Sequence, residues 1–350
     1  MKPASRDFSP LDKQLQVRDV HWSAELARQS VWLSGLVAYG DAAQILQEIG
    51  QVRTSKSSVW RLSQKWGSAY QVEQERTRQA VHALPGRGQI VTGEACSGER
   101  MGASLDGAMV YVLQEGWKEL KLGTIFRVEI ASQLNPDTLE EEEIGQARDV
   151  SYVAHLGGPE LLGQHLWAEA QQRGWTRALD TQVVADAATW IWNQVGEHFY
   201  DSLQLVDWYH ATEHLAQAAE AIYPDQEVAR QRWLNEHKRM LFQGHAEEIA
   251  CILSQTAAEK TELDQEKLRQ EAGYFESQKR RMNYLEMRIE GWLIGSGTVE
   301  SGAKQYKERF TGPGMRWKRS CLERLIPVRS AIMSETFDRL WRNIYYSPLN

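Results

Sequence analysis

The chain has 350 residues and a net charge of −7, and its 42% hydrophobic and 25% charged residues are typical of a globular protein. No apolar run is long enough to span a membrane, and the first residues lack the apolar core of a signal peptide. Three widely spaced cysteines, Cys96, Cys251 and Cys321, argue against a disulfide framework or a cysteine-based zinc site, so we expect a cytoplasmic protein.

The charge is distributed unevenly along the sequence. Residues 1–80 carry a net charge of +3 and residues 301–350 a net charge of +6, which leaves −16 for the residues between them. Basic ends around an acidic centre fit a DNA-binding protein. They also fit an enzyme without a polymer substrate, so the charge pattern alone does not decide.

The first 84 residues are predicted to be helical. Helical patterning begins near Trp22, a second segment covers residues 41–50, and a third covers residues 55–67. The last two segments, joined by a tight turn, have the outline of a helix-turn-helix. A helical hairpin that only packs against its neighbours is the alternative. The cations that would face DNA from the second helix are Lys56, Arg61 and Lys65.

A Pro- and Gly-rich break at residues 84–88 marks a domain boundary. The Asp106-Gly107 pair beyond it is interpreted as a tight turn between two strands. Residues 132–149 are acidic, and we expect a solvated loop there. Three strand candidates lie at residues 103–105, 109–113 and 122–130.

Strands and helices alternate between residues 159 and 206, which favours an α/β layer. Residues 211–290 are rich in helix-forming residues and hold no strand candidate, so we expect an all-helical insertion. One or two helices are predicted over residues 320–345. In the alternating region, the expected helices are residues 159–173 and 190–195, and the expected strands are residues 181–185 and 203–206.

Three carboxylates are candidates for a catalytic site. Asp106 and Asp186 each follow a strand-like apolar run, and Glu300 lies on a helix that begins near Gly295. Carboxylates without thiolates suit Mg²⁺ or Mn²⁺. Two such ions about 3.5–4 Å apart can activate a nucleophilic oxygen and stabilise the leaving oxygen of a phosphodiester. Many folds place acids at strand ends, so this spacing by itself is not specific.

Glu300 shares one helix face with Lys304 and Lys307, at positions i, i+4 and i+7. A carboxylate followed by two cations suits a metal held beside a phosphate, and the alternative is a solvated face with an ion pair. His210 and His214 offer a second possible metal site, in which both would bind zinc together with Asp207. Because the glutamate of an HExxH protease motif is absent, we favour a structural or DNA-proximal role for this segment.

Four stretches, in order across roughly residues 85–330, resemble signatures of the DDE transposases of ISKra-type insertion sequences, which are related to Mutator-like transposases. They are Asp106-Gly-Ala-Met with Gly116-Trp-Lys-Glu-Leu-Lys-Leu-Gly, residues 185–192, residues 207–215, and residues 295–301 with Gly314-Met-Arg-Trp317. The resemblance implies a ribonuclease H-like domain with a helical insertion before the final glutamate. It implies Asp106, Asp186 and Glu300 as the catalytic and metal-binding triad, and places Asp207 and His210 in an accessory motif.

The chain departs from this family in two ways. Ala185 stands where glycine is usual, and the sequence has no cysteine-rich, zinc-ribbon-like N-terminal segment. The first change leaves the Asp186 carboxylate in place, whereas the second puts the mode of DNA recognition in doubt.

We therefore predict an α/β protein whose ribonuclease H-like core is a mixed sheet flanked by helices. The expected function is that of a transposase that cleaves and transfers DNA strands with two Mg²⁺ or Mn²⁺ ions. It would act on double-stranded DNA, at transposon ends and target, as a homodimer or higher homo-oligomer in a prokaryotic cytoplasm, near the nucleoid. The alternatives are a transposase-derived DNA-binding protein without strand transfer and a stand-alone metal-dependent nuclease.

The predicted regions are a helix-turn-helix-like part (1–84), the first part of the core (85–210), the helical insertion (211–290), and the catalytic helix with the C-terminal helices (291–350). The predicted DNA contacts are Lys56, Arg61, Lys65, Lys304, Lys307, Arg309, Arg316, Trp317, Lys318 and Arg319.

Overall fold

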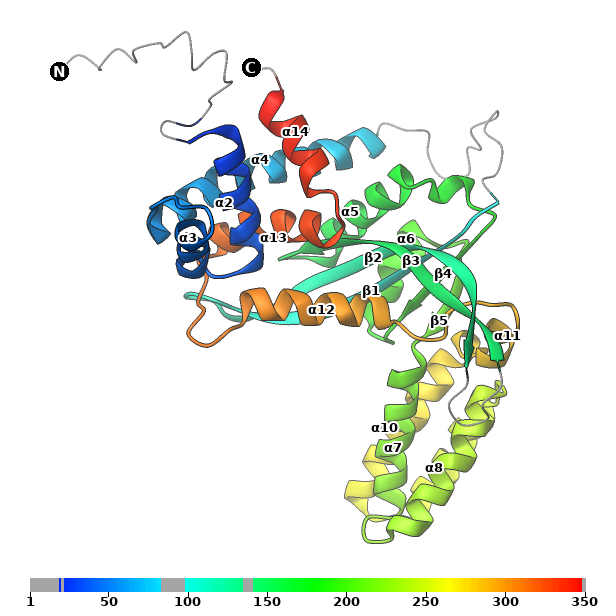
Figure 1. The fold of residues 1–350 in the computed structure, drawn as a ribbon. Helices are drawn as coiled ribbons and strands as arrows, with labels where there is room; N and C mark the ends of the chain where they lie inside the picture. The colour runs from blue at the N-terminus through cyan, green and yellow to red at the C-terminus, as the bar shows by residue number, and fades with distance from the viewer. Residues whose placement is uncertain (1–18, 20–21, 83–97, 135–140, 348–350) are drawn as a thin grey trace, which may run out of the picture.

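The computed structural model describes residues 19, 22–82, 98–134 and 141–347 (Figure 1). A five-stranded mixed sheet has the strand order β3-β2-β1-β4-β5. β1, β2 and β3 are antiparallel neighbours, and β4 and β5 run parallel to β1. The predicted α/β class is confirmed. The strands are β1 (Arg100–Val112), β2 (Gly116–Leu134), β3 (Glu141–His155), β4 (Asp180–Ala185) and β5 (Leu203–Val206).

Along the sequence, helices lie before the first strand, between the strands and after the last strand. No helix in the described ranges is both long and apolar enough to cross a membrane. The helices are α2 (Ala24–Leu36), α3 (Tyr39–Glu48), α4 (Lys56–His82), α5 (Pro159–Gln172), α6 (Thr189–His198), α7 (Trp208–Ile222), α8 (Glu227–Phe242), α9 (Ala246–Ala258), α10 (Glu262–Gln278), α11 (Tyr284–Ile289), α12 (Gly297–Phe310), α13 (Arg319–Met333) and α14 (Phe337–Tyr346).

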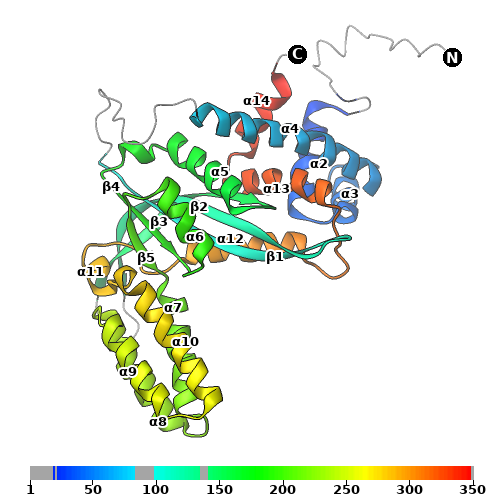
Figure 2. The same ribbon diagram turned by 180° about the vertical axis from the view of Figure 1, so that it is seen from behind.

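The sheet separates two hydrophobic cores. On the back face, α5 and α6 pack against alternate residues of β1 such as Ala103 and Leu105. On the front face, α12 covers β1 and α13 covers β3, and both helices share a core with Ala108 and Val110 of β1. This division follows from the pleat, because successive side chains of a strand point to opposite faces. Figures 1 and 2 show α12 on one side of the sheet and α5 and α6 on the other.

The predicted helical insertion is present as α7 to α11, which lie between β5 and α12. In Figure 1 its long helices extend below the sheet, away from the N-terminal helices. Its inner residues, among them Leu241 and Leu253, join the back-face core. The predicted helices and strands between residues 159 and 206 are confirmed as α5, β4, α6 and β5.

The predicted turn at Asp106-Gly107 is wrong, because both residues lie inside the continuous strand β1. Asp106 and Gly107 pair with Leu122 and Lys121 of β2. The hairpin turns only after Val112, where a positive φ of 68° at Gln114 and 77° at Gly116 reverses the chain.

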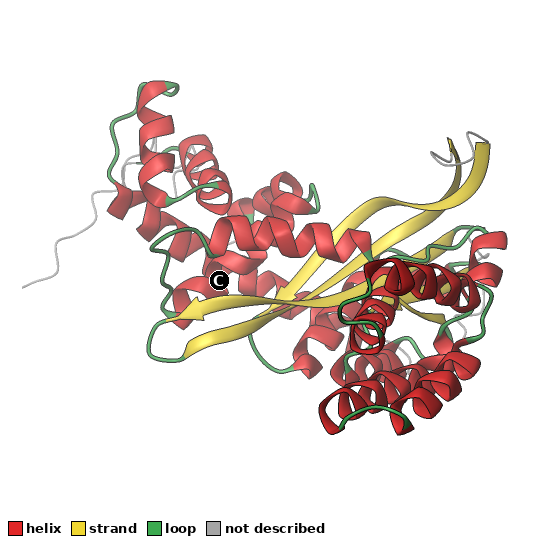
Figure 3. Cartoon of the chain, turned by 90° about the horizontal axis from the view of Figure 1, so that it is seen from below, coloured by secondary structure: helices red, strands yellow, loops and turns green. Residues whose placement is uncertain are grey.

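The predicted loop over residues 132–149 is also wrong. β2 and β3 continue as an antiparallel ladder to Leu134 and Glu141, and Figure 3 shows this long hairpin extending beyond the helices. Residues 135–140 lie outside the described ranges. Most side chains at this end of the hairpin are exposed. Acidic residues are therefore compatible with a strand whose stability comes from backbone pairing instead of burial.

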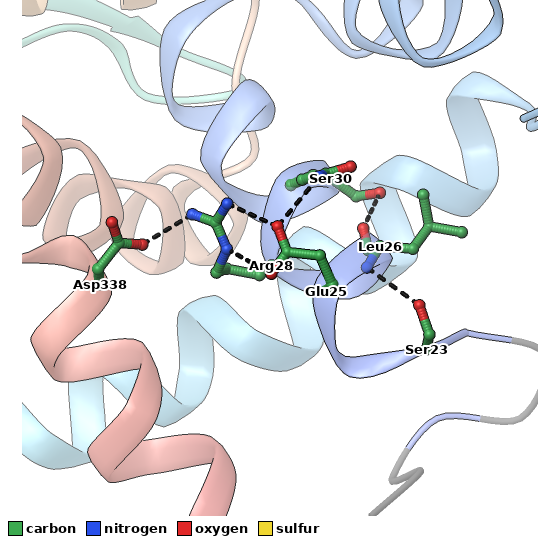
Figure 4. Close-up of polar contacts among 7 residues, drawn as sticks. Ser23, Glu25, Leu26, Arg28, Ser30 and Asp338 are labelled. Carbon is green, nitrogen blue, oxygen red and sulfur yellow. Dashed lines mark hydrogen bonds and ion pairs between the residues drawn. The ribbon is translucent and has the colours of Figure 1, made fainter. Parts of the chain in front are cut away.

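The N-terminal helices pack on the front face together with the C-terminal ones. α3 and α4 match the two predicted helices, but α4 is a single helix of 27 residues, not a short one. Trp66 of α4 stacks on Tyr345 of α14 with ring centroids 4.9 Å apart. Arg28 of α2 pairs with Asp338 of α14 at 2.7 Å (Figure 4). The predicted boundary at residues 84–88 falls outside the described residues.

Candidate active site

Three aspartates are placed alike on three parallel strands: Asp106 lies inside β1, and Asp186 and Asp207 directly follow β4 and β5. The β1–β4 ladder ends with Ala103 opposite Val183, and the β4–β5 ladder ends with Ala185 opposite Val206. Counted forward from the last pair of each ladder, Asp106, Asp186 and Asp207 fall at the same level. Because neighbouring strands lie about 4.8 Å apart, we expect three carboxylates to be gathered where β4 and β5 end beside β1.

Asp106 and Asp186 are half-buried, and each accepts a hydrogen bond from the next backbone N–H. The distances are 2.6 Å from Gly107 N and 2.5 Å from Ala187 N. Burial raises the pKa of Asp106, and the negative charge of Asp186 adds to the rise. The Gly107 N–H and the charges of His210 and Lys307 lower it. The charges that act on Asp106 are therefore of both signs, and burial has the largest influence on its pKa.

Asp207 is fully buried and connects two helices. Its Oδ1 accepts a hydrogen bond from His210 N at 2.9 Å and caps α7, which begins directly after it. Its Oδ2 accepts one from Ser296 N at 2.5 Å, in the turn that begins α12. One carboxylate therefore fixes the first turn of α7 relative to the first turn of α12.

Glu300 lies in that first turn of α12, and its Oε1 accepts a hydrogen bond of 3.4 Å from Ser296 Oγ. One ligand atom each from Glu300, Asp207 and His210 lies within 4.8 Å of the others. Among the described residues, this is the group of His, Cys, Asp or Glu whose donor atoms come that close. Asp106 and Asp186 stand beside this group but are not part of it.

The structure thus gives Asp207 and His210 a more central place than the sequence suggested. We predicted both as accessory residues next to a triad of Asp106, Asp186 and Glu300. A signal for Asp207 was present, since it follows the strand ending at Val206 just as Asp186 follows the strand ending at Ala185. The position of His210 depends on helix α7, which turns its ring towards α12.

The alternative zinc pair of His210 and His214 is not assembled. His214 Nδ1 lies 2.6 Å from Glu271 Oε2 of α10, and its ring stacks on Tyr274 with centroids 3.6 Å apart. His210 instead approaches Asp207 and Glu300. The two histidines therefore have different neighbours, and His214 helps to hold α10 of the insertion against α7.

Most predicted DNA contacts are on the surface. Lys65 is paired with Asp19, and Arg319 is bound to Glu115 at 2.6 Å and to Glu323 at 3.3 Å. The other exposed members of the set are Lys56, Arg61, Lys304, Lys307, Arg316 and Lys318.

Arg309 and Trp317, which we also predicted as DNA contacts, are buried, with 2% and 7% of their surface exposed. Arg309 Nε donates a hydrogen bond to Ser34 O at 2.9 Å, and Trp317 Nε1 donates one to Phe310 O at 2.8 Å. Both side chains belong to the front-face core. They cannot touch DNA in this arrangement, and we leave them out of the DNA-binding set.

The side chains available as metal ligands are four carboxylates and one imidazole, from Asp106, Asp186, Asp207, Glu300 and His210. Carboxylate oxygens are ligands for Mg²⁺ and Mn²⁺, so the side chains fit the ions that the sequence predicts. No protein-family model matches the sequence, and no curated protein matches it with significant similarity.

Proposed function

We propose that this chain is a DDE-type transposase with a ribonuclease H-like core, which cleaves DNA and transfers the cut strand. One observation carries the proposal: three aspartates fall at one level of three parallel strands, and Glu300 approaches one of them, Asp207, from the helix that crosses the front face. The resemblance of the four sequence stretches supports it, because each stretch contains one of these acids: Asp106, Asp186, Asp207 and Glu300. The helical insertion between β5 and α12 agrees with what that resemblance implies.

Asp106, Asp186 and Glu300 would hold two Mg²⁺ or Mn²⁺ ions, with Asp207 and His210 as neighbouring donors. When bound, such ions stabilise the attacking and leaving oxygens of a phosphodiester. Asp207 is best suited to a positioning role, because both of its oxygens already accept backbone N–H groups. It holds the turn that presents Glu300.

The cations of α12 would bind the substrate's phosphates. Lys304 and Lys307 are exposed on the helix that carries Glu300, and the charge of Lys307 acts on Asp106. A phosphate beside the carboxylates therefore meets a positive charge that offsets their repulsion. The exposed cations Lys56 and Arg61 of α4 would contact the transposon end, in a homodimer or higher homo-oligomer assembled on DNA.

The test uses Glu300→Gln, which keeps the side chain's size but removes one negative charge. We expect cleavage to fall about a hundredfold, because one ion loses a charged ligand that aligns it for the transition state. DNA affinity is expected to stay within about twofold, because lysines and arginines make the phosphate contacts. Glu308→Gln, an exposed change on the same helix, is the matched control.

Duplexes made from the DNA that flanks the gene serve as substrate, with and without Mg²⁺, and both nicked and strand-transfer products are measured. Nicking without transfer would favour the nuclease, and binding without either product would favour the DNA-binding protein. Full cleavage by Glu300→Gln would remove Glu300 from the site.

A further inference from the structure

The hairpin that joins β1 to β2 ends in an exposed surface that the proposed chemistry does not use. Trp117 lies there with 60% of its surface exposed, although its motif is one of the four stretches that carry the resemblance. Trp117 pairs with Tyr111 across the ladder, and their rings meet edge to face with centroids 5.7 Å apart. The indole is therefore held at a defined place on a paired strand while its outer side faces solvent.

A third segment adds positive charge beside this pair. Trp317 forms a parallel bridge with Val112, and both side chains are buried on the front face. Because side chains alternate along extended backbone, the neighbours of Trp317 point to the other side. These neighbours are Arg316 and Lys318, and both are exposed. Figure 2 shows the hairpin tip next to the connection from α12 to α13.

We call this surface the hairpin-tip patch. It combines an aromatic pair and exposed apolar side chains with two cations. Glu119, opposite Met109, lies on the same face, and its carboxylate is paired with Lys121 at 2.5 Å. Its members are Met109, Tyr111, Leu113, Trp117, Arg316 and Lys318, of which Met109 is 46% and Leu113 36% exposed.

We propose that the hairpin-tip patch binds unpaired nucleotides of a DNA strand, with a base stacked on Trp117 and phosphates next to Arg316 and Lys318. Aromatic side chains beside cations are the usual means of holding single-stranded nucleic acid, because every base has a face that can stack. The two cations favour a phosphate backbone over the apolar surface of a second protein.

The patch and the candidate active site lie on opposite faces of β1. Asp106 is on the same face as Ala108 and Val110, whereas Tyr111, five positions further along the strand, points to the other face with its partner Trp117. The proposal therefore goes beyond the proposed function and does not depend on the chemistry at the carboxylates.

The test compares Trp117→Ala and Trp117→Phe by fluorescence anisotropy with a labelled oligo-dT of about twenty nucleotides and with a duplex of equal length. Tyr200→Ala is the matched control, because Tyr200 is 48% exposed and lies between α6 and β5. We expect Trp117→Ala to weaken oligo-dT binding about tenfold and duplex binding less than threefold. Trp117→Phe keeps a stacking face and is expected to lose less than threefold.

A second arm tests the cations. Removing Arg316 or Lys318 is expected to lower the slope of log affinity against log salt for oligo-dT by about 0.7 each. Unchanged oligo-dT binding in Trp117→Ala, or an equal loss in Tyr200→Ala, would overturn the proposal. The proposal would also be overturned if sedimentation showed a changed oligomeric state for Trp117→Ala while DNA binding stayed intact. The patch would then be an interface between copies of the chain.

The two proposals fail separately. Without any cleavage by the wild type, a tenfold loss in Trp117→Ala still identifies a single-strand binding surface. With normal cleavage and unaltered binding in Trp117→Ala, the active site stands and the patch does not.

Discussion

The two faces of the sheet are covered in different ways. On the back face, α5 follows β3 and α6 follows β4, so each helix packs on strands that are near in sequence. On the front face, α12 and α13 come from the C-terminal part and are themselves covered by α2 and α4 from the N-terminal part. The catalytic candidate Glu300 belongs to the front face. Its position therefore depends on contacts between segments that are hundreds of residues apart.

The buried polar contacts of the front face join helices to one another, whereas on the back face Arg173, at the end of α5, donates to Ile125 O of the sheet at 2.8 Å. Arg309 of α12 donates to Ser34 O at the end of α2. Arg329 of α13 donates to Gln305 O of α12 at 3.0 Å and to Gly35 O of α2 at 3.4 Å. These guanidinium groups join three helices. Directional bonds of this kind fix one arrangement, because a buried carbonyl that loses its donor is costly.

The largest expected effect comes from breaking such a contact. Arg309→Met should lower the free energy of unfolding by about 2–3 kcal/mol, because Ser34 O loses a charged donor and the cation near Trp317 and Tyr39 is removed. Urea unfolding at pH 7 measures it, with the exposed Lys304→Met on the same helix as control. Equal stability of the two variants would show that apolar packing alone holds the front face, as replaced buried charges sometimes allow.

A smaller effect on stability, dependent on pH, is expected at His165 of α5. Burial lowers the pKa of His165 to about 4, and the nearby His155 contributes to the shift. The unfolded chain takes up a proton near pH 6.5 while the folded chain does not, so stability falls as pH decreases from about 6.5 towards 4. Between pH 7 and pH 5, the free energy of unfolding should fall by about 1–2 kcal/mol less in His165→Asn than in the wild type.

Unfolding midpoints at the two pH values, for wild type and variant, measure this difference. His245→Asn is the control, because His245 is an exposed residue at the start of α9. An identical pH dependence in His165→Asn and wild type would mean that His165 is protonated in the folded state as readily as in the unfolded state.

The smallest effect on stability is expected at the start of α4, on the outer side of the front-face helices. Lys56→Ala and Arg61→Ala should each change unfolding by less than about 0.5 kcal/mol, because both side chains are exposed. Each should reduce the salt slope of duplex binding by about one if it contacts a phosphate. Lys65→Ala should reduce it less, because Lys65 is already paired with Asp19. Unchanged slopes for all three would leave α3 and α4 as a packing hairpin.

Much of the fold could be predicted from local sequence. The apolar runs that end at Ala185 and Val206 predicted β4 and β5, and the helix-forming composition of residues 211–290 predicted the helical insertion. Strong local patterns of this kind depend on a few neighbouring residues. Asp186, Asp207 and Glu300 were therefore assigned to strand ends and a helix start before any tertiary contact was known.

The continuity of β1 and the acidic part of β3 were not predicted, because their stability comes from pairing with a partner strand. The Asp106-Gly107 pair has the composition of a turn, but the ladder with Leu122 and Lys121 keeps it extended. The acidic residues 141–149 resemble a loop, but they pair with β2 along nearly their whole length. In both cases cross-strand hydrogen bonds outweigh weak local preferences.

The sequence by itself determined which acids and cations are available, and on which type of element each one lies. Only the tertiary structure decided their neighbours: the parallel ladders of β1, β4 and β5 lead towards Asp106, Asp186 and Asp207, and the contact of Asp207 with Ser296 brings Glu300 near His210. It also exposed Trp117 and buried Trp317, which local sequence cannot distinguish, since both stand beside a lysine. The physical reason is that burial and register are set by partners far along the chain.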